Sequence, residues 1–247
     1  MGVPGSLRDN EIIVQDAVSD DYETIRYVKD YSVKYQNAWF KEMVSLIQRT
    51  GLVLDNGCGV GYLVEIPPSS DIVGIDISIG MLDKAKRRLE KIVYGDSQSL
   101  PFKDETFDVI ICRALLHHLP DPGKGIDEMR RVLKKGGEIV VSEPIKSIFN
   151  SIPRKMVKEC SHFSDLHKDF SDKVLIEMLR DRFSINDVKY FGYIAYPVMG
   201  FPDIIDPMKY VPFRKFISNL LISLDGIISR VPVINKQSWG IIIKASK

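Results

Sequence analysis

The stretch Leu52-Val53-Leu54-Asp55-Asn56-Gly57-Cys58-Gly59-Val60-Gly61 decides the fold of this chain. An apolar run ends in an acid, and three glycines follow at every second position. This pattern predicts a buried strand that stops in a tight turn, where backbone N–H groups can approach a ligand closely. A dinucleotide fingerprint, Gly-x-Gly-x-x-Gly, would need a glycine at Tyr62 or Val64, so that reading is excluded.

The rest of the chain alternates between strand and helix patterns. Strands are predicted at 52–55, 72–76, 92–96, 107–112, 138–142, 185–191 and 238–244. Helices are predicted at 20–48, 78–91, 125–133 and 171–183, with a short one between the glycines and Pro67. Strands separated by single helices are typical of a parallel sheet with helices on both faces. We therefore predict an α/β fold with a Rossmann-like, doubly wound, mostly parallel sheet of seven strands.

The same patterns suggest a domain organisation. The expected parts are a flexible lead or cloning remnant (1–8), an N-terminal helical cover (9–50), a ligand-binding core (51–144), a lid-like segment (145–170), two segments that complete the sheet (171–191 and 236–247) and an apolar helical insertion (192–235). In the insertion, apolar residues at three-four spacing predict an amphipathic helix over 213–228.

An aromatic stripe precedes the core. Tyr27, Tyr31, Tyr35 and Trp39 recur every four residues and therefore share one helix face. The simpler interpretation is that the stripe packs on the main domain. The alternative is that Tyr22 or Tyr27 reaches over a ligand.

Composition excludes several classes of protein. With 45% hydrophobic residues and a net charge of +1, the chain can fill a core, and a nucleic-acid partner held mainly by charge is not expected. The three cysteines, Cys58, Cys112 and Cys160, lie far apart, which argues against a zinc site or disulfide framework and fits a reducing cytosol. We find no signal-peptide pattern and no long uncharged apolar run, and we expect a cytoplasmic location.

Motifs between Leu52 and Pro144 resemble those of class I S-adenosylmethionine-dependent methyltransferases, in the small-molecule group that includes the quinone-biosynthesis enzymes. The matching segments are the Asp-x-Gly-x-Gly-x-Gly of 55–61, Gly-Ile-Asp-Ile-Ser at 74–78, Gly-Asp-Ser-Gln-Ser-Leu-Pro-Phe at 95–102, Ala-Leu-Leu-His-His-Leu at 114–119 and Arg-Arg-Val-Leu-Lys-Lys-Gly-Gly at 130–137. The sequence departs from the family at Asn56, where an apolar residue is usual, and at Ser97, which is commonly alanine.

The resemblance implies a site for S-adenosylmethionine, and for its product S-adenosylhomocysteine, at the carboxyl ends of the strands. Asp55 and the glycine turn would lie against the methionine part, Asp76 would accept the ribose hydroxyls, and Asp96 would accept the adenine amino group. Ile77 offers an apolar face and Ser97 a backbone N–H to the adenine. The residues expected to bind the cofactor are Asp55, Gly57, Cys58, Gly59, Gly61, Asp76, Ile77, Asp96, Ser97, Cys112, Arg113 and Tyr22.

Methyl transfer needs positioning, exclusion of water and, for some acceptors, a base. His117 and His118 follow the fourth strand, and one of them could accept a proton or hold the acceptor. Equally, they could only contact the cofactor or a neighbouring helix. Glu143, which ends the fifth strand, is an alternative base or a local cap, and His162 and His167 are weaker candidates. No carboxylates cluster at the fourth strand, so we expect no metal.

These observations predict an enzyme that moves a methyl group to a small, hydrophobic or lipid-like acceptor by in-line displacement. The alternatives are a non-catalytic cofactor-binding scaffold or partner protein on the same fold, and an RNA or protein methyltransferase. Helix 213–230 could be an ordinary packed part, a lid over the acceptor, a homodimer surface or a peripheral contact with a membrane, since Arg214, Lys215 and Arg230 flank it.

Overall fold

The computed structural model describes residues 7–62, 71–147, 150, 170–200, 202 and 206–247. The short helix expected before Pro67, together with Cys160, His162 and His167, lies outside these residues. Among the residues described, no helix is long and apolar enough to cross a membrane.

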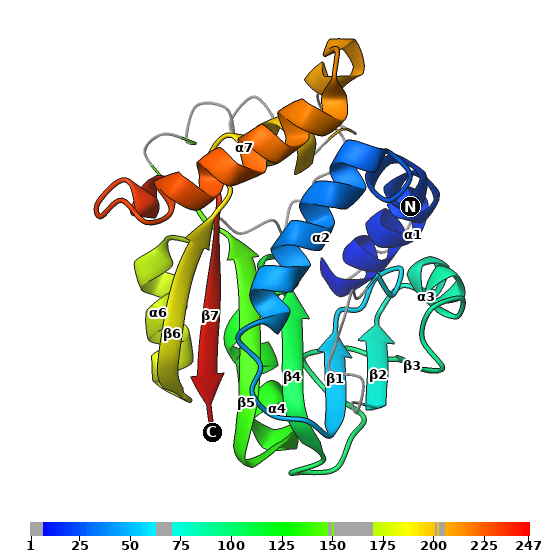
Figure 1. Cartoon of the computed structure of the whole chain (residues 1–247). Helices are drawn as coiled ribbons and strands as arrows, with labels where there is room; N and C mark the ends of the chain where they lie inside the picture. Colours follow the sequence, from blue (N-terminus) through cyan, green and yellow to red (C-terminus); the bar gives the residue numbers. More distant parts are fainter. Residues whose placement is uncertain (1–6, 63–70, 148–149, 151–169, 201, 203–205) are drawn as a thin grey trace.

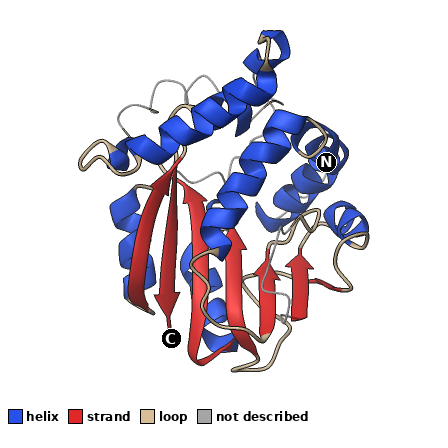
Figure 2. Ribbon diagram, in the orientation of Figure 1, coloured by secondary structure: helices blue, strands red, loops and turns tan. Residues whose placement is uncertain are grey.

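Seven strands form one sheet in the order β3-β2-β1-β4-β5-β7-β6, as Figures 1 and 2 show. Their bounds are β1 (Leu52–Asn56), β2 (Asp71–Asp76), β3 (Lys91–Tyr94), β4 (Phe107–Arg113), β5 (Leu133–Pro144), β6 (Ser184–Phe191) and β7 (Gly240–Ser246). Neighbouring strands from β3 to β5 are parallel, whereas β7 runs antiparallel to both β5 and β6. The predicted mostly parallel, seven-stranded α/β fold is confirmed.

Helices cover both faces of this sheet. Their bounds are α1 (Leu7–Arg26), α2 (Asp30–Val44), α3 (Ile79–Ala85), α4 (Pro122–Val132), α6 (Asp172–Arg180) and α7 (Arg214–Ile228), with the short turns η1 (Leu116–His118), η2 (Tyr196–Gly200), η3 (Pro207–Tyr210) and η4 (Asn235–Gln237). Helix α2 lies on one face, α4 and α6 lie on the other, and α1 packs beside α3 at the end where the parallel strands stop.

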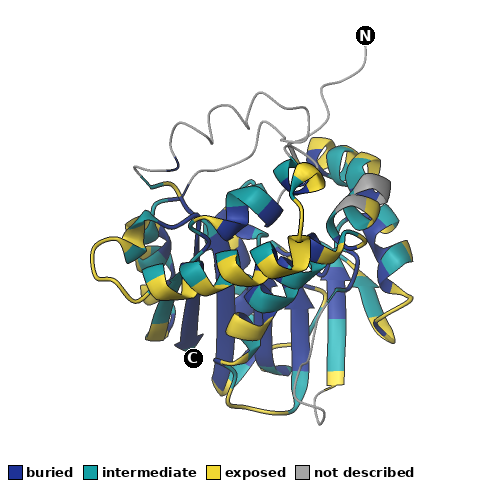
Figure 3. Ribbon diagram, turned by 45° about the horizontal axis from the view of Figure 1, so that its top comes forward, coloured by how far each residue is buried: buried dark blue, intermediate teal, exposed yellow. Residues whose placement is uncertain are grey.

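Alternate residues of each strand enter two separate hydrophobic clusters, as a sheet buried on both faces requires. Val53, Val109 and Val140 pack under α2 with Trp39. On the opposite face, residues such as Ile110 pack with α4 and α6. Figure 3 shows the strands largely buried and the exposed residues gathered on the surrounding helices and loops.

Two helix boundaries differ from the sequence-based expectation. The helix predicted at 20–48 is two helices, of which the first begins at Leu7, so Leu7 and Arg8 belong to α1 and not to a flexible lead. Tyr31, Tyr35 and Trp39 pack on the sheet as expected, but Tyr27 lies in the turn between the helices and packs with Val60 and Met81. The packing interpretation of the stripe is therefore confirmed for three members.

Helix α3 is also shorter than predicted. Ser78 caps it as expected, its hydroxyl accepting a hydrogen bond from the Met81 N–H at 3.1 Å. The helix ends at Ala85 and not near Lys91, because β3 begins at Lys91 and a turn must bring the chain back to the sheet.

Candidate active site

The candidate site lies at the carboxyl ends of β1 and β4, where the strand order reverses. Ligands of open parallel sheets bind at such a switch point. The glycine turn follows β1, Asp76 ends β2, Asp96 follows β3 and Arg113 ends β4. The structure thus brings the sequence-predicted cofactor residues to one edge of the sheet.

Each glycine of the turn has a left-handed backbone, with φ of +76° at Gly57, +51° at Gly59 and +72° at Gly61. Side chains are excluded at two of them, since a Cβ on Gly57 would lie 2.9 Å from Leu115 and one on Gly61 3.1 Å from the backbone of Ala85. A Cβ on Gly59, by contrast, would meet no atom within 4 Å. Gly59 therefore faces open space.

Two carboxylates border this open space. Asp76 accepts hydrogen bonds from the Gly59 N–H at 2.8 Å and from the Ser78 N–H at 2.9 Å, so it holds the turn in place. Asp55 is buried, and its pKa is raised to about 7, because burial, together with the neighbouring Asp76, outweighs the lowering by Arg113. A cation bound beside these carboxylates would favour their charged forms.

The two departures from the family pattern are partners of each other. The Ser97 hydroxyl donates to Asn56 Oδ1 at 2.8 Å, and both side chains are buried. This bond joins the end of β1 to the segment after β3, so a polar residue is tolerated where the family has an apolar one. Next to it, the Asp96 carboxylate accepts from the Gln98 N–H at 2.8 Å.

Helix α1 lies over the site and contacts the residues that follow three strands. Arg8 Nε lies 3.2 Å from Asp96 Oδ2, and Glu11 Oε1 lies 2.9 Å from Nδ1 of His118. Asp16 accepts from Ser78 Oγ and from the backbone N–H of Gly80. The sequence analysis did not predict these contacts, because charged side chains on a helix ordinarily face the solvent.

Arg113 connects the end of β4 to the N-terminal helices. Its guanidinium donates to Tyr27 Oη at 2.8 Å and to Gln36 Oε1 at 2.9 Å, and it lies 4.0 Å over the ring of Phe40. Burial raises the pKa of Tyr27 to about 12. The ring of Tyr22 lies 5.9 Å from that of Tyr27, in the cluster that contains Val60 of the glycine turn.

His117 and Glu143 form a buried pair beneath the site. His117 Nδ1 lies 2.6 Å from one carboxylate oxygen of Glu143, and the other oxygen accepts from the Leu115 and Leu116 N–H groups at 2.8 Å each. Burial raises the pKa of Glu143 to about 7, although the backbone donors and His118 lower it. Both oxygens are engaged, so Glu143 orders the loop after β4 and orients His117.

His118 is the more accessible of the two histidines, with 26% of its side chain exposed. Its ring lies 4.1 Å from that of His117, and its positive charge would lower the pKa of Asp76, which burial raises. The geometry therefore places His118 nearer to the open part of the site. The catalytic roles expected of His117, His118 and Glu143 stay predictions.

The remaining predicted residues have simpler surroundings. Cys58 packs with Leu82 and Leu89, and Cys112 lies in the core, so both thiols are protonated because burial raises their pKa values. Ile77 is half-buried directly after Asp76. Within the described part of the chain, no group of three potential metal ligands comes together.

Comparisons with known proteins identify the family of this chain. Residues 54–141 match a family described as a methyltransferase domain. The demethylmenaquinone methyltransferase of Thermotoga maritima is 26% identical over 234 residues, which cover 90% of this chain and 96% of that protein. The chain belongs to the class I S-adenosylmethionine-dependent methyltransferases.

Solved structures show the same fold. A possible histamine N-methyltransferase of Thermotoga maritima superimposes with a TM-score of 0.67 at 19% identity, over 96% of this chain and 99% of that one. Phosphoethanolamine N-methyltransferase 2 of Haemonchus contortus, solved with phosphomonomethylethanolamine and S-adenosylhomocysteine, superimposes with a TM-score of 0.61 at 18% identity, over 98% of this chain and 60% of that one.

Proposed function

We propose that this protein transfers a methyl group from S-adenosylmethionine to a small, hydrophobic or lipid-like acceptor. The observation that carries the proposal is the arrangement of Asp55, Asp76 and Asp96 around a glycine turn whose middle glycine faces open space. An isolated strand-terminal acid is usually a cap, but three acids at one edge of a parallel sheet suit one polar ligand.

The residues present fit the cofactor. A Cβ on Gly59 would meet no protein atom within 4 Å, so the glycine leaves open space that the cofactor can occupy. Asp76 keeps lone pairs beyond its two backbone donors, so it can accept ribose hydroxyls. Near the adenine end, the buried Asn56 Nδ2 has no hydrogen-bond partner among the described residues and is available as a donor. Asp55 would face the ammonium group, and Asp96 the adenine amino group.

When bound, S-adenosylmethionine supplies a methyl group on a positively charged sulfur, which an acceptor atom attacks in line. The protein itself holds the cofactor and the acceptor, orients them for the reaction and excludes water. Helix α1 covers the site through Arg8, Glu11 and Asp16. His118 would hold the acceptor or take its proton, while the Glu143 carboxylate contacts the neighbouring His117.

Two observations support a hydrophobic acceptor. One relative is a demethylmenaquinone methyltransferase, and it aligns with nearly the whole chain. The apolar segment around α7 packs against α2, which itself covers the sheet beside the site. An acceptor that bound between these helices and the cofactor residues would contact apolar side chains.

Asp76→Ala tests the cofactor site. We expect the affinity for S-adenosylhomocysteine, measured by titration calorimetry, to fall by about 1.5–3 kcal/mol, since hydrogen bonds to a charged acceptor are lost. The matched control is Asp71→Ala at the opposite end of β2, where the carboxylate is exposed and pairs with Lys91; it should bind normally. Equal affinity of both variants, or no binding by the wild-type protein, would contradict the proposal.

The acceptor class is tested separately by release of S-adenosylhomocysteine across quinols, phenols, amines, RNA and peptides. Turnover with apolar quinols or phenols supports the proposal. Normal cofactor binding without turnover on any of these classes would favour the non-catalytic scaffold instead.

A further inference from the structure

Helix α7 packs Ile217, Leu221 and Ile222 against the hydrophobic cluster beneath it and leaves a second set of apolar residues exposed. Ser218 and Asp225 are its two buried residues, although each is polar. The Asp225 carboxylate accepts hydrogen bonds from the backbone N–H groups of Tyr193 at 3.0 Å, Ile194 at 2.8 Å and Ala195 at 3.2 Å. Three charge-assisted hydrogen bonds to a buried carboxylate fix the rotation of the helix about its axis. These bonds therefore keep the apolar outer side of α7 facing the solvent.

The outward side carries large apolar residues. Phe216, Leu220 and Ile227 are exposed on α7 itself, and Tyr210, Phe213 and Val233 on the turns at its two ends are 82%, 83% and 78% exposed. Together with Val231 and Ile234, this segment supplies eight of the fourteen large apolar residues that are exposed among the described residues. Soluble proteins rarely gather so many on one surface without a partner.

Both turns have a backbone that disfavours the residue present. Phe213 has φ +53° and Val233 has φ +73°. The left-handed region is uncommon for aromatic residues and is an outlier for a β-branched one. One such residue lies at each end of α7, and each carries an exposed apolar side chain. Strained backbone of this kind is concentrated at functional sites.

The same segment is basic. Between Pro207 and Ser238 the chain has five cations and one acid. The acid is Asp225, which is buried, whereas the cations Lys209, Arg214, Lys215, Arg230 and Lys236 are all exposed. The segment thus concentrates positive charge in a chain whose net charge is only +1.

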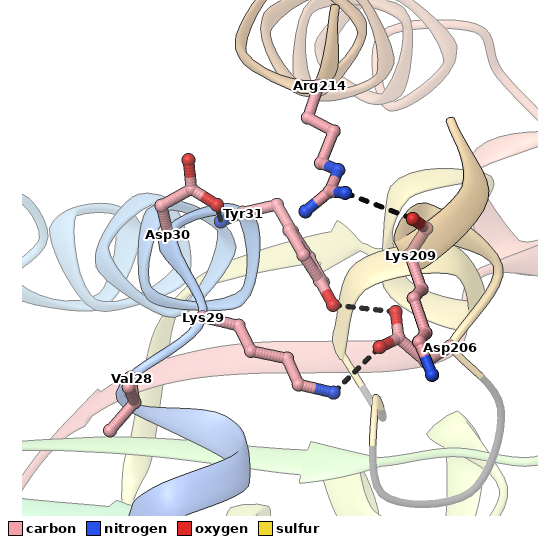
Figure 4. A pocket seen from close by; sticks show the side chains of 7 residues that line it. All are labelled: Val28, Lys29, Asp30, Tyr31, Asp206, Lys209 and Arg214. Carbon is pink, nitrogen blue, oxygen red and sulfur yellow. Dashed lines mark hydrogen bonds and ion pairs between the residues drawn. The ribbon is translucent and has the colours of Figure 1, made fainter. Parts of the chain in front are cut away.

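A cavity of about 730 Å³ opens beside the first turn of α7 (Figure 4). Three cations and two acids are among its lining residues, which are Val28, Lys29, Asp30, Tyr31, Asp206, Lys209 and Arg214, and none of the predicted cofactor residues lines it. Asp206 accepts from Lys29 Nζ at 2.7 Å and from the Tyr31 hydroxyl at 2.6 Å, so its charge is already matched. Among the described residues, the Arg214 guanidinium makes one hydrogen bond, to the Lys209 carbonyl at 3.0 Å, and its other N–H groups could donate to an anion.

We propose that residues 207–236 bind the surface of an anionic lipid bilayer. The exposed aromatic and aliphatic side chains insert at the level of the headgroups, the five cations attract the lipid phosphates, and Arg214 and Lys209 hold one phosphate at the mouth of the cavity. Aromatic side chains with an adjacent basic fringe are suited to this interface.

Charge favours a bilayer over a second copy of the chain. In a two-fold dimer the same patch meets itself, which would oppose five cations on each side with no exposed acid between them. An anionic bilayer supplies the missing negative charge. If the proposed acceptor class is right, on which this consequence rests, the same surface would bring the site to the membrane where a lipid-like acceptor dissolves.

The experiment is co-sedimentation of the full chain with vesicles of phosphatidylcholine alone and of phosphatidylcholine mixed with phosphatidylglycerol. We expect binding to the mixed vesicles only, weakening as salt is raised. Phe216→Ser should lower the partition coefficient about ten-fold. The matched control is Val174→Ser, which changes an exposed apolar residue on α6 and should bind like the wild type.

Charge variants test whether the cations of this segment attract the lipid phosphates. Lys215→Glu should weaken binding at least five-fold, whereas Lys173→Glu on α6 should not. If the cavity holds a phosphate, Arg214→Ala weakens binding more than Arg230→Ala at the other end of α7; an equal loss would overturn that assignment.

Several results would overturn the membrane proposal. These are absence of binding to anionic vesicles, equal binding by Phe216→Ser and Val174→Ser, or a concentration-dependent dimer that Phe216→Ser dissociates. Thermal unfolding monitored by circular dichroism verifies that each variant is folded. Calorimetry with S-adenosylhomocysteine separates this failure from failure of the proposed enzyme function, because vesicle binding does not use the cofactor residues.

Discussion

The sheet edge beneath α1 and the outer surface of α7 place their side chains in opposite ways. At the sheet edge, Asp55 and Glu143 are buried; Glu143 accepts hydrogen bonds from two backbone N–H groups, and Asp55 lies near both Arg113 and Asp76. On α7, aromatic residues such as Phe216 are exposed while Asp225 lies inside. Each region departs from the ordinary distribution of polar and apolar residues.

The comparison teaches that two similar buried carboxylates serve different ends. Glu143 accepts from two backbone N–H groups and contacts His117, so it orders the loop that borders the ligand site. Asp225 accepts from three backbone N–H groups, so it sets which side of a helix faces the solvent. In both places a buried carboxylate positions a neighbouring surface, which is the loop after β4 for Glu143 and the outer side of α7 for Asp225.

Glu143→Ala should have the largest effect on stability. It removes the acceptor of two buried backbone donors and the partner of His117, so we expect the free energy of unfolding in urea to fall by about 3–5 kcal/mol. Glu143→Gln keeps an acceptor for the backbone N–H groups, so its free energy of unfolding should fall by less. If Gln abolishes turnover yet leaves His117 and folding unchanged, Glu143 is a base and not a positioning residue.

Asp225→Ala probes the other carboxylate of the comparison. Its three backbone donors would lose a buried acceptor, and we expect a loss of about 2–3 kcal/mol in the free energy of unfolding. Asn219→Ala, on the exposed side of the same helix, is the matched control and should change stability by less than about 0.5 kcal/mol. Equal effects of the two substitutions would show that Asp225 does not orient α7.

Buried acids in both regions should make the stability of the protein depend on pH. Burial raises the pKa values of Asp55 and Glu143 to about 7, so between about pH 4.5 and 7 the folded chain binds more protons than the unfolded one. The free energy of unfolding should therefore decrease as pH rises through this window, by at most about 1.4 kcal/mol per pH unit for each group, and level off above it.

Urea unfolding at several pH values measures this slope. Glu143→Gln should reduce it because one of the two groups no longer titrates, whereas Glu177→Gln, an exposed residue of α6, should leave it unchanged. A slope that Glu143→Gln does not alter would mean that Glu143 is ionised throughout the folded state. Asp225, whose pKa burial also raises, acts in the same direction.

The sequence predicted the sheet well because short apolar runs, glycines and strand-terminal acids are local signals. All seven strands occur where they were expected, although β5 begins at Leu133, five residues before the predicted start at 138. The contacts of α1 were not predictable in this way. Arg8 and Glu11 have ordinary helical surroundings in the sequence, and only folding brings them to Asp96 and His118.

The pair of Asn56 and Ser97 illustrates the same limit. Each departure was visible in the sequence, but they are 41 residues apart and their hydrogen bond depends on how the ends of β1 and β3 approach each other. Tyr27 likewise continues the four-residue spacing of the stripe, yet the turn between α1 and α2 directs it to Arg113.

By itself, the sequence determined the α/β fold and the class of enzyme, and it singled out the acids that we propose bind the cofactor, because those features follow from patterns within a few residues of one another. Only the tertiary structure decided how α1 covers that site and which side of α7 faces outward. A helical pattern shows that a helix has two faces, but the choice between them depends on distant groups, here the three backbone donors that meet Asp225.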